Sequence, residues 1–171
     1  MKEIELVLEA ARRSDLDQLV ALDARAFSRI DRYFRREWSD LLDESLAIGP
    51  ARINVARSGR RLVGVVVVAT DAEARDVTIV SLAVDQRWRR QGVASRLLRT
   101  ALAQVPEEIC TAVLEVRPDN GGARALYDSL GFRVTRRLRH YYADGTAALE
   151  YRAPLSVVLA QLAERTPGGA R

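Results

Sequence analysis

The sequence predicts one domain of mixed α/β class. Its 171 residues match a single domain, which commonly contains about 100–150 residues. Apolar residues make up 48% of the chain, enough to form a hydrophobic core. Strand-like and helix-like segments follow one another in the order β-α-α-β-β-β-α-β-α-β-β, without internal repeats. This alternation is typical of a sheet covered by helices.

The N-terminal part predicts a strand and two helices. Residues 4–8 alternate in polarity as a strand does, and Ser14 offers an N-cap for a helix that extends to Phe27. A second helix, rich in charge, is predicted over residues 33–46 and ends at Gly49-Pro50. The apolar stripe of this second helix consists of Phe34, Trp38, Leu41 and Leu42.

Three strands follow in the sequence. Residues 52–56 and 61–70 are predicted to form a hairpin around the turn at 58–60. Residues 71–76 form a polar turn. Residues 77–84 are densely β-branched, which indicates a strand in the centre of the sheet.

The second half of the chain begins with a different pattern. A polar, basic segment at 85–91 leads into a helix that starts at Val93 and is closed by Pro106. A strand over 112–116 and a helix over 120–130, stopped by a glycine, come next. The basic segment at 85–91 and the helix that starts at Val93 therefore end the series of antiparallel strands predicted before residue 85.

The C-terminal part predicts two more strands and a helix. Residues 132–142 and 147–153 are expected to pair around a turn at 143–145. The domain is expected to cover residues 1–153, with a short helix and a loose tail over 154–171. The terminal helix is consistent with two roles, supporting a homodimer or covering the core of a monomer.

Composition narrows the classes of function. No apolar run approaches the roughly 20 residues of a membrane span, and the first residues lack the features of a signal peptide. Cys110 is the only cysteine, which excludes an intrachain disulfide and zinc sites with several cysteines and favours the cytoplasm. No metal site and no membrane partner are expected. The formal charge is +4, but the arginines are spread along the chain, so a solvated surface is favoured over a nucleic-acid site.

A basic turn between a strand and a helix carries the clearest chemical signal. It has the sequence Arg89-Arg90-Gln91-Gly92-Val93-Ala94. Unpaired N–H groups and the positive dipole end at a helix N-terminus bind phosphate, and glycine lets the ligand come close to the backbone. The turn lacks the patterns of a nucleotide P-loop and of a dinucleotide fold. These residues alone therefore leave two interpretations equally open, an anion-binding turn and a purely structural one.

Several motifs in one order resemble the GNAT acetyltransferase superfamily. The stretch Arg89-x-x-Gly92-x-Ala94 resembles its [Q/R]-x-x-G-x-[G/A] acetyl-CoA motif. Later matches are Leu114-Glu115-Val116-Arg117-Pro118-Asp119-Asn120, Ala125-Leu126-Tyr127, Leu130-Gly131-Phe132 and Arg139-His140-Tyr141-Tyr142-Ala143-Asp144-Gly145. The last resembles the R-x-Y-Y-x-x-G segment of N-terminal-amine acetyltransferases, with the ribosomal-protein-alanine enzymes as the nearest type. The resemblance covers roughly residues 3–153. It implies the GNAT fold, a mixed, mostly antiparallel central sheet flanked by helices.

The resemblance also implies roles for individual residues. Acetyl-CoA would be held by Leu82, Ala83, Val84, Arg89, Arg90, Gln91, Gly92, Val93, Ala94, Ser95 and Asn120. Glu115 would act as the base and Tyr127, twelve residues later, as the acid. Tyr141 or Tyr142 would touch the acceptor. No covalent acyl-enzyme is required, so Cys110 is expected to be structural.

The chemistry of acetyl transfer to an amine matches these roles. An ammonium must lose a proton, which is easier for an α-amine with a pKa near about 8 than for a lysine near about 10.4. The thioester oxygen gains negative charge and needs a donor such as the Val84 N–H. The leaving thiolate needs an acid. Glu115 and Tyr127 would supply the base and the acid.

Each candidate residue also has a structural interpretation. Glu115 shares one face of its strand with Val113 and Arg117, so without the resemblance a solvent-facing position is favoured, and the resemblance shifts the preference to a base. The Tyr127 ring is of a kind that packs into a core. Asn120 is also a suitable N-cap, alone or in addition to a cofactor contact. The tyrosines at 141 and 142 would be ordinary hairpin residues, and His140 is expected to be structural or peptide-facing.

Three functions remain after this comparison. The leading hypothesis is acetylation of a primary amine, most favourably a protein N-terminus. The second is acetylation of a small amine, such as a polyamine, an antibiotic or an amino acid, for which Asp31, Asp40, Asp43 and Glu44 could supply an acidic pocket. The third is a non-catalytic acetyl-CoA-binding module. The segment 27–50 departs from the alanine acetyltransferases, so the resemblance defines the donor better than the acceptor.

Overall fold

The computed structural model describes residues 6–29, 31–47 and 49–165 of the chain. The strands are β1 Val7–Ala10, β2 Ala51–Ser58, β3 Arg61–Asp71, β4 Asp76–Val84, β5 Thr111–Val116, β6 Arg133–Leu138 and β7 Ala148–Pro154. The helices are α1 Leu16–Ala26, α2 Arg35–Leu46, α3 Val93–Leu102, α4 Gly121–Ser129 and α5 Leu155–Glu164. Short 3₁₀ helices at Arg13–Asp15 and Gln86–Trp88 precede α1 and the basic turn.

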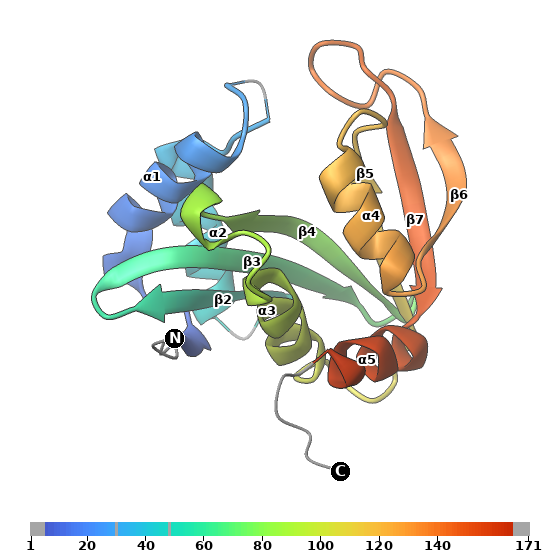
Figure 1. The fold of residues 1–171 in the computed structure, drawn as a ribbon, viewed down its shortest axis with the longest axis horizontal. Helices are drawn as coiled ribbons and strands as arrows, with labels where there is room; N and C mark the ends of the chain where they lie inside the picture. Colours follow the sequence, from blue (N-terminus) through green and yellow to red (C-terminus); the bar gives the residue numbers. More distant parts are fainter. Residues whose placement is uncertain (1–5, 30, 48, 166–171) are drawn as a thin grey trace.

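The strands form one sheet in the order β1-β2-β3-β4-β5-β7-β6 (Figure 1). Only β4 and β5 pair in parallel, and the other neighbouring pairs are antiparallel. The expected mixed, mostly antiparallel sheet is confirmed. The strand predicted to be central, β4, is the fourth of the seven.

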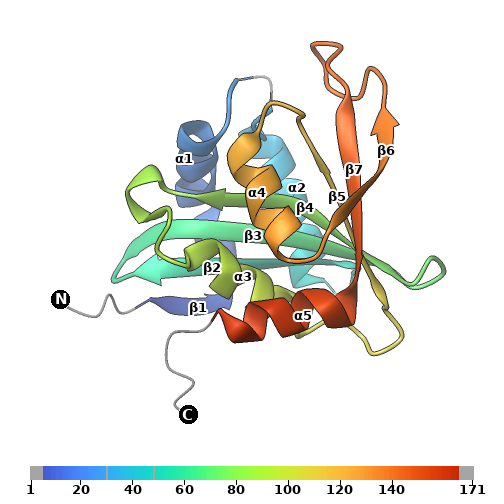
Figure 2. The ribbon, with the colours of Figure 1, turned by 45° about the vertical axis from the view of Figure 1, so that its right-hand side comes forward.

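Helices cover both faces of the sheet. The first face packs against α1 and α2 through a core that includes Leu19, Leu22, Trp38 and Leu42. The opposite face packs against α3, α4 and α5, which Figure 2 shows in front of the sheet. Strand β3 is buried on both faces, which explains its nearly continuous apolar sequence.

The sheet opens between β4 and β5. The two strands pair only at Asp76–Thr78 and Thr111–Val113. Immediately beyond this point the register of β4 shifts, because Val67 pairs with Ser81 while Val68 pairs with Ile79, so Val80 is bulged. A bulge bends its strand, and the two halves of the sheet then diverge (Figure 1). This divergence creates the space in which the candidate site lies.

The structure corrects the predicted beginning of the chain. Ser14 is not the N-cap of α1, because it lies inside the 3₁₀ helix and α1 starts after Asp15. The Asp15 carboxylate instead accepts the Arg12 N–H at 2.9 Å and pairs with Arg57 at 2.5 Å. The first strand begins at Val7, and residues 4 and 5 of the predicted strand lie outside the described residues.

Two further expectations were wrong in detail. Phe34 does not belong to the apolar stripe of α2, because it is the N-cap residue and 55% of its surface is exposed. Strand β6 ends at Leu138 instead of 142, since His140 has a positive φ of 52° that a strand does not allow. Residues 139–147 therefore lie outside the strands, but the turn predicted at 143–145 is present, since the Gly145 N–H donates to the Tyr142 carbonyl at 2.8 Å.

Helix α5 packs into the same core as α3. Its apolar residues Leu155, Val158 and Leu162 are buried there. In the described part of the chain, no helix has the length and apolar character needed to cross a membrane. The predicted loose tail over 166–171 lies outside the described residues.

Candidate active site

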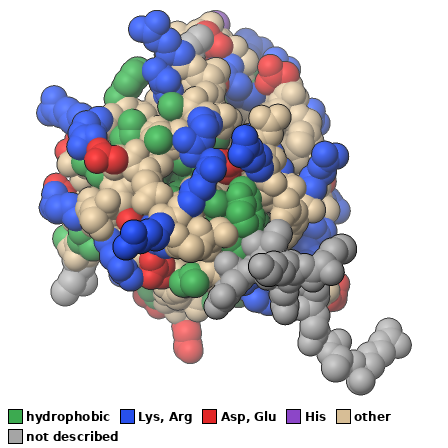
Figure 3. Space-filling model, turned by 60° about the vertical axis from the view of Figure 1, so that its left-hand side comes forward, with side chains coloured by type: hydrophobic (Ala, Val, Ile, Leu, Met, Phe, Trp, Pro, Cys, Tyr) green, Lys and Arg blue, Asp and Glu red, His purple; other side chains and the backbone are tan. Residues whose placement is uncertain are grey.

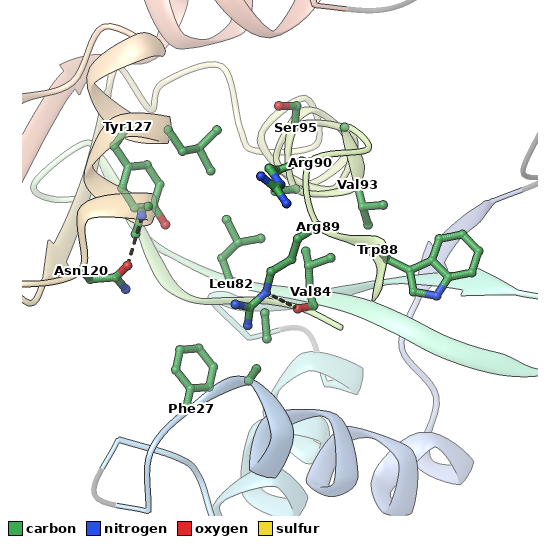
Figure 4. Close-up of a pocket in the computed structure, with 17 residues that line it drawn as sticks. Phe27, Leu82, Val84, Trp88, Arg89, Arg90, Val93, Ser95, Asn120 and Tyr127 are labelled. Carbon is green, nitrogen blue, oxygen red and sulfur yellow. Dashed lines mark hydrogen bonds between the residues drawn. The ribbon is translucent and has the colours of Figure 1, made fainter. Parts of the chain in front are cut away.

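Two cavities lie where β4 and β5 diverge. The first has a volume of about 470 Å³ and is bounded by the end of β4, the basic turn, the start of α3 and the side of α4 (Figure 4). The second has a volume of about 250 Å³ and lies between β4, β5 and two loops. The residues that line both are Phe27, Leu82, Asn120, Ala123 and Tyr127. These shared walls make the two cavities neighbours.

The end of β4 offers backbone groups to the first cavity. The Asp85 N–H donates to the Val63 carbonyl at 2.9 Å, so Asp85 is bonded to β3. In an antiparallel ladder the alternate residues point their backbone groups the other way, which directs those of Leu82 and Val84 toward the opening. The Val84 carbonyl accepts a hydrogen bond from Arg89 Nε at 3.1 Å (Figure 4).

The basic turn has the backbone of an anion site. Arg90 and Gly92 both have positive φ, 59° and 76° respectively. The Arg96 N–H donates to the Gly92 carbonyl, so the N–H groups of the first three residues of α3 precede the hydrogen-bond ladder of the helix. A Cβ placed on Gly92 would meet nothing within 4 Å, so the space in front of the turn is open. A phosphate fits these donors and this space.

Nearly all residues predicted to hold acetyl-CoA line the first cavity. Gln91 does not, because its side chain turns back and donates to the Arg87 carbonyl at 2.8 Å. Arg89 and Arg90 line the cavity and bring positive charge to it. Figure 3 shows one face of the molecule, on which arginines are scattered with acidic side chains between them and do not form one patch.

Asp85 anchors the segment between β4 and the turn. Its side chain is 6% exposed, accepts the Arg87 N–H at 3.1 Å and pairs with Arg61 at 2.8 Å and with Arg25 at 3.5 Å. Burial raises the pKa of Asp85, but these hydrogen bonds and charges outweigh burial and lower it overall. The carboxylate therefore stays charged and fixes the path of the chain into the turn.

Asn120 caps α4 beside both cavities. Its side-chain oxygen accepts the Ala123 N–H at 3.1 Å, which confirms the predicted N-cap. The side-chain nitrogen has no hydrogen-bond partner among the described residues. The amide can therefore donate to a ligand while its oxygen holds the helix.

Glu115 lines the second cavity from the middle of β5. The strand face that it shares with Val113 and Arg117 is not an open surface, since Val113 is 5% exposed and the Arg117 side chain 16%. Burial, followed by the charge of Glu150, raises the pKa of Glu115 above its ordinary value. The carboxylate is thus a stronger base than an exposed glutamate.

Tyr127 joins the two cavities. Its ring packs edge-on against Phe132 with the centroids 5.6 Å apart, as expected for a core residue. Its hydroxyl points toward the interior of the first cavity (Figure 4). Burial raises the pKa of this hydroxyl well above 10, so the group remains protonated and can donate.

The outer wall of the second cavity is built from two loops. Arg117 bonds Asp31 of the α1–α2 loop at 2.9 Å and Asp144 of the β6–β7 loop at 3.0 Å. Its guanidinium also lies 4.0 Å from the ring centroid of Tyr142, and Tyr142 packs edge-on against Tyr141 at 5.1 Å. The structure thus places both predicted tyrosines at this cavity. Burial, partly offset by Arg117, raises the pKa of Tyr142 to about 12.

Sequence reasoning missed part of this wall. Phe27 and Tyr33 line the second cavity, where Asp31, suggested from the sequence only for a small-amine pocket, is bonded to Arg117. They precede Glu115 by more than eighty residues in the sequence, so no local pattern relates them to it. Arg117 itself follows Glu115 by two residues on the same strand face, and this spacing is a signal that could have identified it.

Comparisons with known proteins identify the same family that the motifs resemble. Residues 13–132 match the model of the Acetyltransferase (GNAT) family. An N-alpha-acetyltransferase from Sulfurisphaera tokodaii is 42% identical over 80 residues, 45% of this chain and 47% of that protein. N-alpha-acetyltransferase 30 from Schizosaccharomyces pombe is 32% identical over 147 residues, 80% of this chain and 88% of that protein.

A solved structure shares the fold. The ribosomal-protein-S18-alanine N-acetyltransferase from Escherichia coli matches with a TM-score of 0.74 at 22% identity, over 88% of this chain and 94% of that one. The matched part of the chain spans less than half the length of the first four curated relatives, from 30% to 47%.

Proposed function

Because this chain belongs to the GNAT acetyltransferase family, we propose that it transfers acetyl from acetyl-CoA to a primary amine, with a protein N-terminus as the acceptor. The observation that carries the proposal is the connection of the two cavities. The donor turn opens into the first, Glu115 lies in the second, and Tyr127 lines both. The family resemblance inferred from the motifs is confirmed.

The first cavity suits the donor. The N–H groups at the start of α3 and the side chains of Arg89 and Arg90 would hold its pyrophosphate. The outward-facing backbone of Leu82 and Val84 would pair with its extended arm, and the free side-chain nitrogen of Asn120 would donate to it. The arm would then carry the thioester along β4 toward the second cavity.

The reaction balances with the groups at hand. The ammonium of the acceptor gives one proton to Glu115, and its nitrogen then forms a bond to the acetyl carbon. The carbon–sulfur bond breaks, and the sulfur keeps the electron pair and takes the Tyr127 proton. The second proton of the amine restores Tyr127, while Glu115 releases its proton to solvent. The Val84 N–H is available to the thioester oxygen as its charge grows.

The charges of the second cavity favour a single amine over a polyamine. Of the four acidic residues suggested for a small-amine pocket, only Asp31 lines a cavity, and it is paired with Arg117. Asp43, which lies on α2, forms an ion pair with Arg13. Glu115 is therefore the one carboxylate of this cavity without an ion pair among the described residues. A second ammonium would find no partner here, whereas the surrounding aromatic rings suit a peptide.

The names of the relatives support the same acceptor. The Sulfurisphaera and Schizosaccharomyces proteins are called N-alpha-acetyltransferases, and an α-amine loses its proton more readily than a lysine. The β6–β7 loop, with Tyr141 and Tyr142, would contact the first residues of the peptide.

Turnover with a panel of acceptors tests the proposal. The purified chain is given acetyl-CoA and either N-terminal peptides, peptides with a blocked α-amine and a free lysine, or polyamines. We expect turnover with the first group only. Preferential turnover of polyamines would favour the small-amine function, and binding of acetyl-CoA without turnover on the whole panel would favour a non-catalytic module.

The variant Glu115→Gln tests the base. Turnover should fall most near neutral pH and less at high pH, where the free amine is already present. Glu164→Gln, the same change on an exposed part of α5, is the control. An unchanged pH profile in Glu115→Gln would remove Glu115 from the mechanism.

A further inference from the structure

A second carboxylate lies directly beside Glu115. Glu115 of β5 and Glu150 of β7 are paired in register, so their side chains lie on the same face of the sheet. The Cβ atoms of such pairs are about 4.5–5.5 Å apart, and like charges in this arrangement repel each other. Glu150 lines neither cavity and is 4% exposed. The pair therefore has no obvious structural benefit.

Strand β6 holds Glu150 as an anion. Its Oε1 accepts the Thr135 hydroxyl at 2.8 Å and Arg136 Nε at 3.2 Å, and its Oε2 pairs with the other guanidinium nitrogen of Arg136. Arg152 Nε lies 3.5 Å from Oε1. The hydrogen bonds from Arg136 outweigh burial and lower the pKa of Glu150.

A β-bulge in β6 allows Thr135 and Arg136 to bond to Glu150 together. Successive residues of a regular strand point to opposite faces. The register of β6 shifts between Val134 and Arg136, which leaves Thr135 as an extra residue. The bulge lets two consecutive side chains, Thr135 and Arg136, reach one carboxylate. The local distortion thus has one clear consequence: Glu150 is bonded by two neighbouring donors that favour its charged form.

Glu115 is held differently. Its carboxyl group has no ion pair and no hydrogen bond from another side chain among the described residues, and only its own backbone N–H acts on it as a donor. The charged and titratable groups that act on it are Glu150 and Arg152 of β7, Arg136 of β6, and Tyr141 and Tyr142 of the β6–β7 loop. Of two neighbouring carboxylates, one is fixed as an anion and the other faces the cavity. A proton taken up by the pair is therefore directed to Glu115.

We propose that Glu150 is a positioning residue that acts through Glu115: its fixed negative charge makes Glu115 a stronger base. This inference rests on the proposed function, in which Glu115 accepts the proton of the amine. Glu150 itself touches neither substrate. Its contribution is electrostatic and should therefore change a titration curve, which a merely structural residue would not do.

The variant Glu150→Gln tests the proposal. Glutamine keeps the shape and can still accept from Thr135, and Arg136, already 65% exposed, can turn to solvent. The pKa of Glu115, followed through its ¹³C-labelled carboxyl group by NMR, should fall toward that of an exposed glutamate. In the pH profile of kcat/KM, the acidic limb should move to lower pH together with this pKa. Glu164→Gln should leave the Glu115 pKa and the pH profile unchanged.

Arg136→Gln should act in the opposite direction. It removes a positive charge that lowers the pKa of both carboxylates, so the Glu115 titration and the acidic limb should move to higher pH. Opposite shifts in the two variants support the proposal. A Glu115 titration in folded Glu150→Gln that matches the Glu164→Gln control would overturn it.

The two measurements also separate the proposal from the proposed function. A shifted NMR titration without a shift of the acidic limb would uphold the effect of Glu150 on Glu115 but contradict Glu115 as the base. An unshifted titration with normal turnover would contradict only the role of Glu150.

Discussion

At the scale of single residues, Asp23 has an unusual position. It lies on α1 with no exposed surface, and its Oδ2 accepts the Tyr33 N–H at 2.7 Å. Its Oδ1 and the nearby Trp38 Nε1 are buried and make no hydrogen bond of normal geometry among the described atoms, although the Trp38 N–H still lowers the pKa of the carboxyl group. Burial, opposed by the Tyr33 N–H, raises the pKa of Asp23 from 3.8 to about 6. The residue holds the loop that leads to the second cavity, at a cost in stability.

Replacement of this aspartate should stabilise the protein at neutral pH. Because the folded state binds the proton more tightly, the contribution of Asp23 is fully present below pH 3.8 and is lost as the pH rises through about 6. The two-unit shift corresponds to about 3 kcal/mol. Urea unfolding should therefore show Asp23→Asn more stable than the native chain at pH 7.5 and nearly equal at pH 4, with exposed Asp40→Asn unchanged. Equal stability at pH 7.5 would contradict this prediction.

Gly92 allows a residue-scale test of the donor turn. Its φ of 76° is costly for other residues, so Gly92→Ala should lose about 1 kcal/mol of stability. The new methyl group meets nothing within 4 Å in the free protein but projects where a phosphate would lie. We expect the KM for acetyl-CoA to rise at least tenfold. Gly59→Ala is the matched control, since Gly59 also has a positive φ, 56°, and open space around it. Equal KM values in the two variants would argue against the donor turn.

At the scale of elements, the packing of α3 against β3 determines the position of the basic turn that precedes α3. A Cβ on Gly64 would lie 2.9 Å from Leu97 Cδ1 and 3.1 Å from Val93 Cγ1, both in α3. The glycine lets the helix approach the strand closely. Gly64→Val should therefore push α3 outward, with a loss of about 1–3 kcal/mol and weaker binding of acetyl-CoA. Urea unfolding measures the loss of stability, and calorimetric titration measures the binding of acetyl-CoA. Ala69→Val, at the other end of β3, should leave binding unchanged.

Arg117 connects two loops, and its loss should affect the acceptor more than the donor. Arg117→Met would leave Asp31 and Asp144 without this partner and remove the contact with Tyr142. Because charged hydrogen bonds contribute about 1.5–3 kcal/mol, we expect the KM for the peptide to rise about tenfold while that for acetyl-CoA changes little. Arg117→Lys should recover part of the loss, since one ammonium cannot bridge both carboxylates as a guanidinium does. Equal changes in both KM values would contradict a selective effect on the acceptor.

At the scale of the whole molecule, the sequence predicted the donor half of the site better than the acceptor half. Segments 80–95 and 114–127 are continuous and carry their own periodicity and turn chemistry, so their strands and helices follow from local rules. The wall formed by Phe27, Tyr33 and Arg117 depends on contacts across more than eighty residues. The two bulges, at Val80 and Thr135, arise from pairing between strands and leave no pattern in the sequence.

At the same scale, the division of the sheet between β4 and β5 allows a prediction of how stability and hydrogen exchange respond to coenzyme A. Its two halves are joined by parallel pairing over only three residues of β4, while a donor in the first cavity would touch both the β4 side and α4. Coenzyme A at 100 times its dissociation constant should raise the free energy of unfolding by about 2.7 kcal/mol. Hydrogen exchange should slow at the start of α3 and also along α4. Adenosine diphosphate, which lacks the pantetheine arm, should slow exchange at α3 alone. If coenzyme A left α4 unprotected, the arm could not run between the two halves of the sheet, and the path proposed for the thioester would be wrong.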